Sequence, residues 1–491
     1  MTTAMNTIRE IHDAFDSGKI TPLELTKQYL SQIKASKHNA FITVCDDRAL
    51  KQAETLTTEL KSKHGGKVPR SAMPLYGIPL GIKDVLTMDG VLTTAGSKML
   101  GNYIPPYTAT AVIKLENAGA ISLGKMNMDE FAMGSSNENS AYGPVIHPTH
   151  SDRVPGGSSG GSGTAVAANL CAAALGTDTG GSIRLPASFC GIVGMKPTYG
   201  RISRYGQIAF ASSLDQIGPM TKSVEDAALL CQVMSGIDEK DSTSSDAKVE
   251  NWLQTARDTK IESAKGLRVG VPKEYFIDGI DAEVKNAIEG MIQKLKTAGA
   301  EIVPVTLPHT EYAVATYYVV AVSEASSNLS RIDGVRFGVR PPEAMQAGSL
   351  AEFYKKVRAN FGAEVKRRII LGTFALSSGY YDAYYRKAGQ VRRLMRTDFE
   401  NAFKQVDVIV SPVCPTTAFK LGEKSKDPLK MYLSDIFTIP ASMAGLPAMS
   451  VPVAKDHQGL SIGMHLIAPR FHETELIKAG RIVELLSGGA T

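Results

Sequence analysis

Two glycine-rich turns that carry serines constrain this chain most, and they flank a run of small apolar residues. The first serine turn spans residues 156–162 (GGSSGGS), and the second serine turn spans residues 178–182 (DTGGS). The stretches between them, 165–168 and 170–175, predict a buried, closely packed helix rather than a linker. Glycine turns held against a core bring backbone N–H groups and hydroxyls close to a ligand. We therefore expect a hydrolytic site that does not use histidine.

The bulk properties are those of an ordinary globular protein. The chain has 491 residues, enough to bury a large core, and its net charge of +5 is too small to indicate a nucleic-acid protein by itself. Its five cysteines are scattered and form no C-x-x-C pair, which argues against a disulfide scaffold and a structural zinc. The N-terminus has no apolar signal region, and no apolar run reaches the roughly 20 residues of a membrane span. We expect a soluble, cytoplasmic protein with no membrane contact.

The pattern of elements indicates an α/β fold. Helices are predicted from residue 8 and from residue 22, the second preceded by a Thr21 capping box. Glycines at 119 and 299 each end a helix directly before a strand-like run. Strand-like runs occur at 41–44, 80–82, 120–123, 267–271, 408–410 and 449–451. Helices alternating with buried strands favour an α/β sandwich around a mostly central sheet.

One segment is strongly basic. Residues 352–396 hold eleven Lys and Arg against three acidic residues, so the segment carries 11 − 3 = +8. Such a segment is either a solvated helical face or a surface for a partner, for example RNA. The sequence leaves both readings open.

A serine nucleophile needs an adjacent base, and Ser182 is the candidate nucleophile. No histidine lies between His150 and His309, so a Ser-His-Asp site would have to recruit a distant ring. The available rings are His309, His457, His465 and His472. A nucleophile elbow at Gly156-x-Ser158-x-Gly160 is disfavoured, because Pro155 is a poor ending for the strand that an elbow requires.

Lysine is the other available base, provided that burial lowers its pKa. Lys83 ends the apolar run Leu80–Ile82, which would carry its amine into the core, although a lysine after a strand is most often on the surface. A metal site has little support, since His147 and His150 lie in a proline-containing loop without carboxylates or cysteines.

Three motifs together resemble the amidase signature family. They are residues 77–84 (GIPLGIKD), the first serine turn, and residues 178–184 (DTGGSIR), in the family's order. The resemblance covers nearly the whole chain. It implies one three-layer α/β/α domain with a central mixed sheet over residues 1–491. Within it lie N-terminal helices (1–60), a catalytic core (70–230) and the remainder of the sheet with a glutamine-recognition segment and helices (265–485).

Further stretches are similar to one branch of that family, the A subunits of glutamyl-tRNA(Gln)/aspartyl-tRNA(Asn) amidotransferases. These stretches are residues 124–136, 196–200 and 364–382. The sequence departs from the family at residues 163–164, where alanines are usual, and at Leu185, where glutamine is common. These departures flank the serines and put local packing in doubt more than chemistry.

The resemblance implies a role for each catalytic group. Ser182 is the acyl-forming nucleophile, Ser158 is the bridging serine that follows a cis peptide, and Lys83 is the terminal base. The oxyanion hole is formed by the backbone N–H groups of Thr179, Gly180, Gly181 and Ser182.

The resemblance also implies how glutamine is held, since its α-carboxylate needs a cation and its α-ammonium an anion. Arg368 is expected at the carboxylate and Asp435 at the ammonium, with Gly134 also at the substrate. Tyr318 of the Tyr317–Tyr318 pair closes the pocket, although Tyr317 could do so. Two alternatives stay open: Arg367 could exchange roles with Arg368, and Asp435 could cap a helix.

The implied activity is that of the glutaminase component of a tRNA-dependent amidotransferase, a carbon–nitrogen ligase that takes its amide nitrogen from glutamine. The partners implied are a B subunit, which uses ATP and Mg to phosphorylate the misacylated tRNA, and a small C subunit. This chain itself binds no cofactor or metal. The alternatives are a stand-alone amidase on small carboxamides and a catalytically silent scaffold or RNA-binding module. Whether Glu-tRNA(Gln), Asp-tRNA(Asn) or both are served is open.

Overall fold

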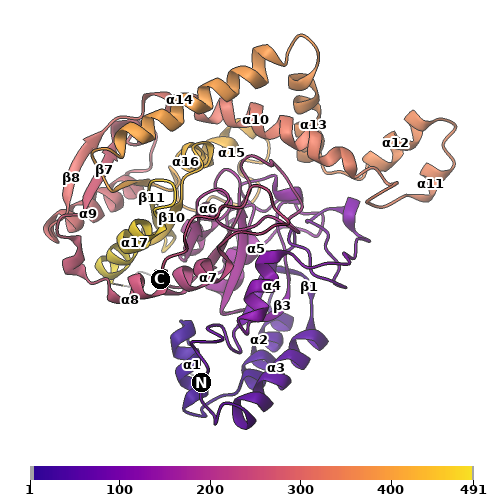
Figure 1. Ribbon diagram of the computed structural model, residues 1–491. Coiled ribbons are helices and arrows are strands. Elements are labelled where there is room, and N and C mark those ends of the chain that lie inside the picture. Colours follow the sequence, from indigo (N-terminus) through magenta and orange to yellow (C-terminus); the bar gives the residue numbers. More distant parts are fainter. Residues whose placement is uncertain (1–4, 489–491) are drawn as a thin grey trace.

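The computed structural model describes residues 5–488, and the strands in that range form a single eleven-stranded mixed sheet (Figure 1). The strand order is β1-β3-β2-β4-β6-β5-β10-β11-β9-β7-β8. The bounds are β1 Phe41–Val44, β2 Pro79–Lys83, β3 Ile121–Met126, β4 Ala173–Asp178, β5 Val193–Lys196, β6 Gln216–Thr221, β7 Arg268–Pro272, β8 Glu301–Val305, β9 Val408–Pro412, β10 Ala448–Lys455 and β11 Ser461–Ile467. Strands β3, β2 and β4 are parallel neighbours, as are β9, β7 and β8, and the remaining pairs are antiparallel.

Helices cover both faces of this sheet. Helices α6 and α17 both contact β10 and β11 and lie on either side of these strands (Figure 1). The helices are α1 Ile8–Asp16, α2 Pro22–Ala35, α3 Asp46–Ser62, α4 Thr110–Asn117, α5 Gly160–Ala167, α6 Arg184–Cys190, α7 Val224–Met234, α8 Trp252–Asp258, α9 Ala282–Thr297, α10 Ala313–Asn328, α11 Pro342–Met345, α12 Leu350–Arg358, α13 Ala363–Leu376, α14 Lys387–Ala402, α15 Pro428–Tyr432, α16 Ile439–Met443 and α17 Glu473–Ser487. The expected α/β fold with a central mixed sheet is confirmed.

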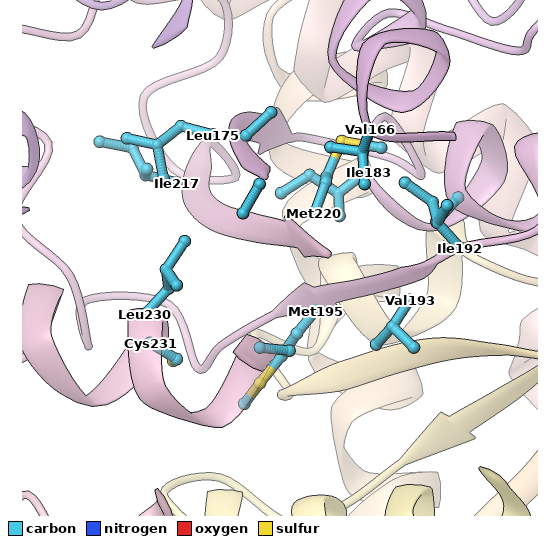
Figure 2. Close-up of a cluster of buried hydrophobic side chains, with 14 of the residues drawn as sticks. Val166, Leu175, Ile183, Ile192, Val193, Met195, Ile217, Met220, Leu230 and Cys231 are labelled. Atoms are coloured by element: carbon cyan, nitrogen blue, oxygen red, sulfur yellow. The ribbon is translucent and has the colours of Figure 1, made fainter. Parts of the chain in front are cut away.

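The core packs against both sides of the central strands. Figure 2 shows Val166 of α5 and Ile183 on one side of them, and Leu230 and Cys231 of α7 on the other. All four side chains are almost fully buried. The alternation of helices and strands in the sequence therefore closes into layers that share one apolar core.

Local signals in the sequence set several boundaries. Thr21 caps α2, because its hydroxyl accepts from the Glu24 N–H and the Glu24 carboxylate accepts from the Thr21 N–H. Gly119 and Gly299 adopt φ of 98° and 101°, each two residues before the first residue of β3 and β8. This left-handed region suits glycine, so the two predicted helix-to-strand junctions are confirmed.

The helix expected between the two serine turns is wrong in its second half. Helix α5 ends at Ala167, Asn169 turns the chain with a φ of +56°, and β4 begins at Ala173. Strand β4 pairs with β2 and β6 in the middle of the sheet, where an alanine-rich run is buried on both faces. Small residues fit a buried strand as well as a helix, so pairing with the neighbouring strands decides the conformation.

The basic segment 352–396 lies mostly in helices α12, α13 and α14, and α11 and α12 extend away from the body of the molecule (Figure 1). Within residues 5–488 no helix combines the length and the apolarity that crossing a bilayer requires.

Candidate active site

Lys83 is the last residue of β2 and is completely buried. Its Nζ lies 2.8 Å from Ser158 Oγ and 2.8 Å from Ser159 Oγ. Two more oxygens, the hydroxyl and the carbonyl of Thr177, lie 2.9 and 3.3 Å away. The alternative of a surface lysine is thereby excluded.

Burial lowers the pKa of Lys83 from 10.5 to about 7, against the raising effect of Asp129, Asp178 and Asp215. A large fraction of this amine is therefore neutral near pH 7. The Thr177 carbonyl can only accept, so it takes an N–H from the lysine. The lone pair of the neutral amine is then available to the Ser158 hydroxyl. This geometry is that of a base acting on Ser158.

The first serine turn is pressed against a buried carboxylate. The Gly157–Ser158 peptide bond is cis, as the family resemblance implies. A Cβ on Gly157 would lie 2.1 Å from Asp129 Oδ2, so only glycine fits. The Asp129 carboxylate accepts the backbone N–H groups of Asn137 and Asn139, and burial raises its pKa to about 6. Asp129 thus fixes the turn that presents Ser158.

The second serine turn connects β4 to α6 and contacts the first directly. The Ser159 N–H donates to the Ser182 carbonyl at 3.2 Å, which places the two turns side by side. Within residues 5–488 the backbone N–H groups of Thr179, Gly180, Gly181 and Ser182 have no acceptor. Four adjacent free donors form a nest suited to an anion.

Two buried carboxylates hold that turn in place. Asp178 pairs with Arg184 at 2.8 Å and accepts the Ile183 N–H. Burial raises the pKa of Asp178, but Arg184 outweighs it and lowers the pKa to about 2. Asp215 accepts the Thr179 hydroxyl at 2.8 Å. The turn is therefore braced on both sides of its free N–H groups.

Asp435 lies across the second serine turn. A Cβ on Gly181 would lie 2.4 Å from Asp435 Oδ1, so the carboxylate directly faces that glycine. Its Oδ2 accepts the Ser135 hydroxyl at 2.5 Å, whereas its buried Oδ1 has no partner among the described residues. Its side chain caps no helix, because α16 begins at Ile439 without a side-chain cap. Burial raises the pKa of Asp435 to about 7.

Arg368, rather than Arg367, points into the protein. Only 4% of the Arg368 side chain is exposed, against 45% for Arg367. Its Nε donates to Glu364 at 2.8 Å, and its guanidinium lies 5.2 Å from the Tyr318 ring centroid and 5.6 Å from that of Tyr432. The buried Arg368 cation thus lies among aromatic rings, and most of its N–H donors have no acceptor within residues 5–488.

The two tyrosines of α10, Tyr317 and Tyr318, contact different parts of the site. Tyr318 stacks on Tyr432 at 3.8 Å between ring centroids, beside Arg368. Tyr317 reaches the second serine turn instead, since a Cβ on Gly180 would lie 2.9 Å from its hydroxyl. Gly134 lies over Asp129, because a Cβ there would come within 2.3 Å of that carboxyl carbon.

The histidine alternatives find no support in the geometry. His465 is buried and bonds to Arg184 and Ser411. Each of the other three rings pairs with a carboxylate outside the serine turns, namely His309 with Asp398, His457 with Glu283 and His472 with Glu475. His147 bonds to the Phe189 carbonyl, and among residues 5–488 no group of three or more His, Cys, Asp or Glu could hold a metal.

Comparison with known proteins agrees with this geometry. The family model described as Amidase matches residues 24–477. The chain belongs to the amidase family. The A subunit of the glutamyl-tRNA(Gln) amidotransferase of Acidobacterium capsulatum is 58% identical over 85% of this chain and 86% of its own length. Its counterpart from Maridesulfovibrio salexigens is 52% identical over 97% and 96%. The crystal structure of the Thermotoga maritima counterpart is 41% identical, with a TM-score of 0.78 over 97% of this chain and 94% of its own.

Several residues of this amidase-family site were not predicted from the sequence. Ser159, inside the first serine turn, and Thr177, directly before the second, contact Lys83, yet the sequence assigns neither of them a role. Asp129 and Asp215 brace the turns from loops that come together only in the fold. Glu364 has a signal, because it precedes Arg368 by four residues on α13, which is the spacing of a helical ion pair.

Proposed function

We propose that this chain is the glutaminase component of a tRNA-dependent amidotransferase. It hydrolyses glutamine and releases ammonia for the conversion of Glu-tRNA(Gln) to Gln-tRNA(Gln). The contact of Lys83 Nζ with Ser158 Oγ, in the turn bonded to Ser182, is the observation that carries the proposal. The identity of 52% with the A subunit of a glutamyl-tRNA(Gln) amidotransferase, over nearly the whole of both chains, supports the substrate.

The proposed reaction begins with a proton relay. Neutral Lys83 takes the proton of Ser158, and Ser158 takes that of Ser182. Ser182 Oγ attacks the side-chain amide carbon of glutamine, and the carbonyl oxygen becomes an oxyanion at the N–H groups of residues 179–182. The intermediate collapses as the C–N bond breaks, and the proton returns through Ser158 to the departing ammonia. Water then cleaves the glutamyl ester by the same relay and releases glutamate.

Recognition of glutamine rests on two buried charges. Arg368 binds the α-carboxylate. The Oδ1 of Asp435, which has no partner in the part of the chain that the structure describes, accepts the α-ammonium. Asp435 lies against Gly181, so the amino-acid end of the substrate sits beside the nucleophile's turn. Tyr318 flanks Arg368 and closes the pocket, and Gly134 leaves room beside Asp129.

The relatives are named as A subunits, which supports an assembly of several chains. We propose a cytoplasmic heterotrimer with a B subunit, which uses ATP and Mg on the misacylated tRNA, and a small C subunit. This chain binds no cofactor of its own. Copurification of the three chains with ATP-dependent amidation of Glu-tRNA(Gln) tests the proposal. Failure to associate, together with turnover of simple carboxamides without preference for glutamine, would point to a stand-alone amidase.

A further inference from the structure

Four arginines from two separate parts of the chain surround a cavity at the C-terminal end of α16. Three of them come from α14, and Arg470 comes from the segment after β11. The cavity has a volume of about 350 Å³ and lies outside the glutamine site. Its lining includes Arg392, Arg393, Arg396 and Arg470, together with Tyr199, Ser213 and residues 443–445. We propose that this cavity binds a phosphate group.

Arg392 lines the cavity and is held in place by hydrogen bonds to the fold. Its guanidinium donates to the Met443 carbonyl at 2.7 Å, to the Ser213 hydroxyl at 2.7 Å and to the Ser213 carbonyl at 2.9 Å. The bond to Met443 also covers a carbonyl at the end of α16, where exposed carbonyls would repel an anion. Three of the five N–H donors of Arg392 are thus used in the fold, and two remain.

The other three guanidiniums keep most of their donors. Arg470 Nε is buried and has no acceptor among the described residues. Arg396 makes one bond, from Nε to Glu400 at 2.7 Å. The Arg393 side chain has no hydrogen-bond or ion-pair partner within residues 5–488. Unspent donors that converge on a cavity indicate a ligand with several acceptor oxygens.

The charges around the cavity favour an anion. No lining residue of the cavity is acidic, and among residues 5–488 two carboxylates lie near its arginines. Glu400 accepts from Arg396, and Glu324, which accepts the Ser213 N–H, lies near Arg392. Four cations against two anions leave an excess of two positive charges. Burial and the neighbouring Arg396 lower the pKa of Arg470, the direction that crowding of like charges produces. An anion in the cavity would relieve that repulsion.

Phosphate fits this arrangement better than a carboxylate. A carboxylate has two oxygens in one plane and engages one or two guanidiniums, whereas a phosphate group presents three or four oxygens in a tetrahedron. Guanidinium forks match phosphate oxygens two at a time. The phosphate can be inorganic phosphate or part of the backbone of an RNA. This site is independent of the glutamine chemistry proposed above.

Two probes test the site on the full chain: inorganic phosphate followed by 31P NMR, and fluorescein-labelled deacylated tRNA followed by anisotropy. The cavity variant is Arg393→Gln with Arg470→Gln, since neither guanidinium bonds elsewhere in the described fold. The matched control is Arg257→Gln with Arg386→Gln, two exposed arginines that pair with Glu225 and Asp382 and do not line the cavity. Both variants lose two positive charges.

The cavity variant should bind at least one probe about tenfold or more weakly than wild type, because it loses two guanidiniums whose charge-assisted hydrogen bonds to phosphate are the stronger kind. The control variant should bind both probes about as tightly as wild type does. A loss with phosphate alone identifies a small-phosphate site, and a loss with tRNA identifies the RNA backbone. Equal binding by the cavity variant and wild type with both probes, or an equal loss in the control, would overturn the proposal. Arg393→Gln alone serves if the double variant unfolds below the assay temperature.

Discussion

The amine of Lys83 lies 2.8 Å from the Ser158 hydroxyl, and within residues 5–488 no carboxylate forms an ion pair with it. An aspartate at this distance would favour the charged form of the lysine, which cannot accept a proton. Asp129, Asp178 and Asp215 act on it only from a distance, and burial lowers its pKa to about 7 despite them. The role proposed for Lys83 as a base thus depends on the exclusion of water and counter-ions from its amine.

The first prediction concerns pH. The protonated amine holds no lone pair, so kcat at saturating glutamine should rise about tenfold per pH unit below the pKa of Lys83 and level off above it. The inflection should lie near the pKa of about 7. Lys196 also has a pKa lowered by burial to about 7, but within residues 5–488 its amine hydrogen-bonds only to the carbonyls of Pro197 and Leu446. Lys196→Met should therefore keep the inflection, and Lys83→Met should abolish turnover.

The second prediction separates two adjacent arginines. Arg368→Gln should raise KM for glutamine about a hundredfold, because a charge-assisted bond to the carboxylate contributes roughly 1.5–3 kcal/mol. Arg367→Gln removes the same charge from the exposed side of α13 and should change KM less than about twofold. Steady-state kinetics on both variants make the comparison. Equal increases in KM in the two variants would contradict the assignment of Arg368 to the glutamine site.

The third prediction concerns the α-ammonium. Only ionised Asp435 attracts a cation, and its pKa in the free protein is raised to about 7. KM for glutamine should therefore fall as pH rises through 7 in the wild type. In Asp435→Asn, KM should be higher and should lose this pH dependence, whereas the kcat inflection of Lys83 should remain. An unchanged KM profile in that variant would contradict the assignment.

The fourth prediction uses two glycines. A Cβ on Gly181 would lie 2.4 Å from both Asp435 Oδ1 and Thr438 Oγ1, so Gly181→Ala should shift the second serine turn. Because loss of one oxyanion donor lowers kcat by roughly 10²–10³-fold, Gly181→Ala should lower kcat by about that factor. Gly290, in the middle of α9, has nothing within 4 Å of such a Cβ. Gly290→Ala should stabilise the protein by about 1 kcal/mol without altering turnover, as thermal unfolding and kinetics together will show.

Much of the fold could be predicted from local signals, because capping boxes and glycine stops act within a few residues. The threonine-capped start of α2 and the glycine-ended α4 and α9 are examples. The failure at residues 165–175 has a physical reason: Ala173 to Leu175 are strand only because β2 and β6 pair with them. No local pattern encodes those distant partners.

The site divides in the same way. Lys83, Ser158 and Ser182 could be named from motifs, since each stands in an unusual local sequence. The residues that brace the serine turns could not be predicted in this way, because Asp129 and Asp215 reach the turns from separate loops. The choice between Arg367 and Arg368 depends on which side of α13 faces the interior, which tertiary packing alone decides.

Mass spectrometry of the protein quenched during turnover of glutamine tests the central claim most directly. We expect a glutamyl adduct on the peptide that contains Ser182, absent in Ser182→Ala and not formed on Ser158. The Ser182→Ala variant should still bind glutamine, because Arg368 and Asp435 are untouched. An adduct on Ser158 or on another residue, or turnover that persists in Ser182→Ala, would contradict the account.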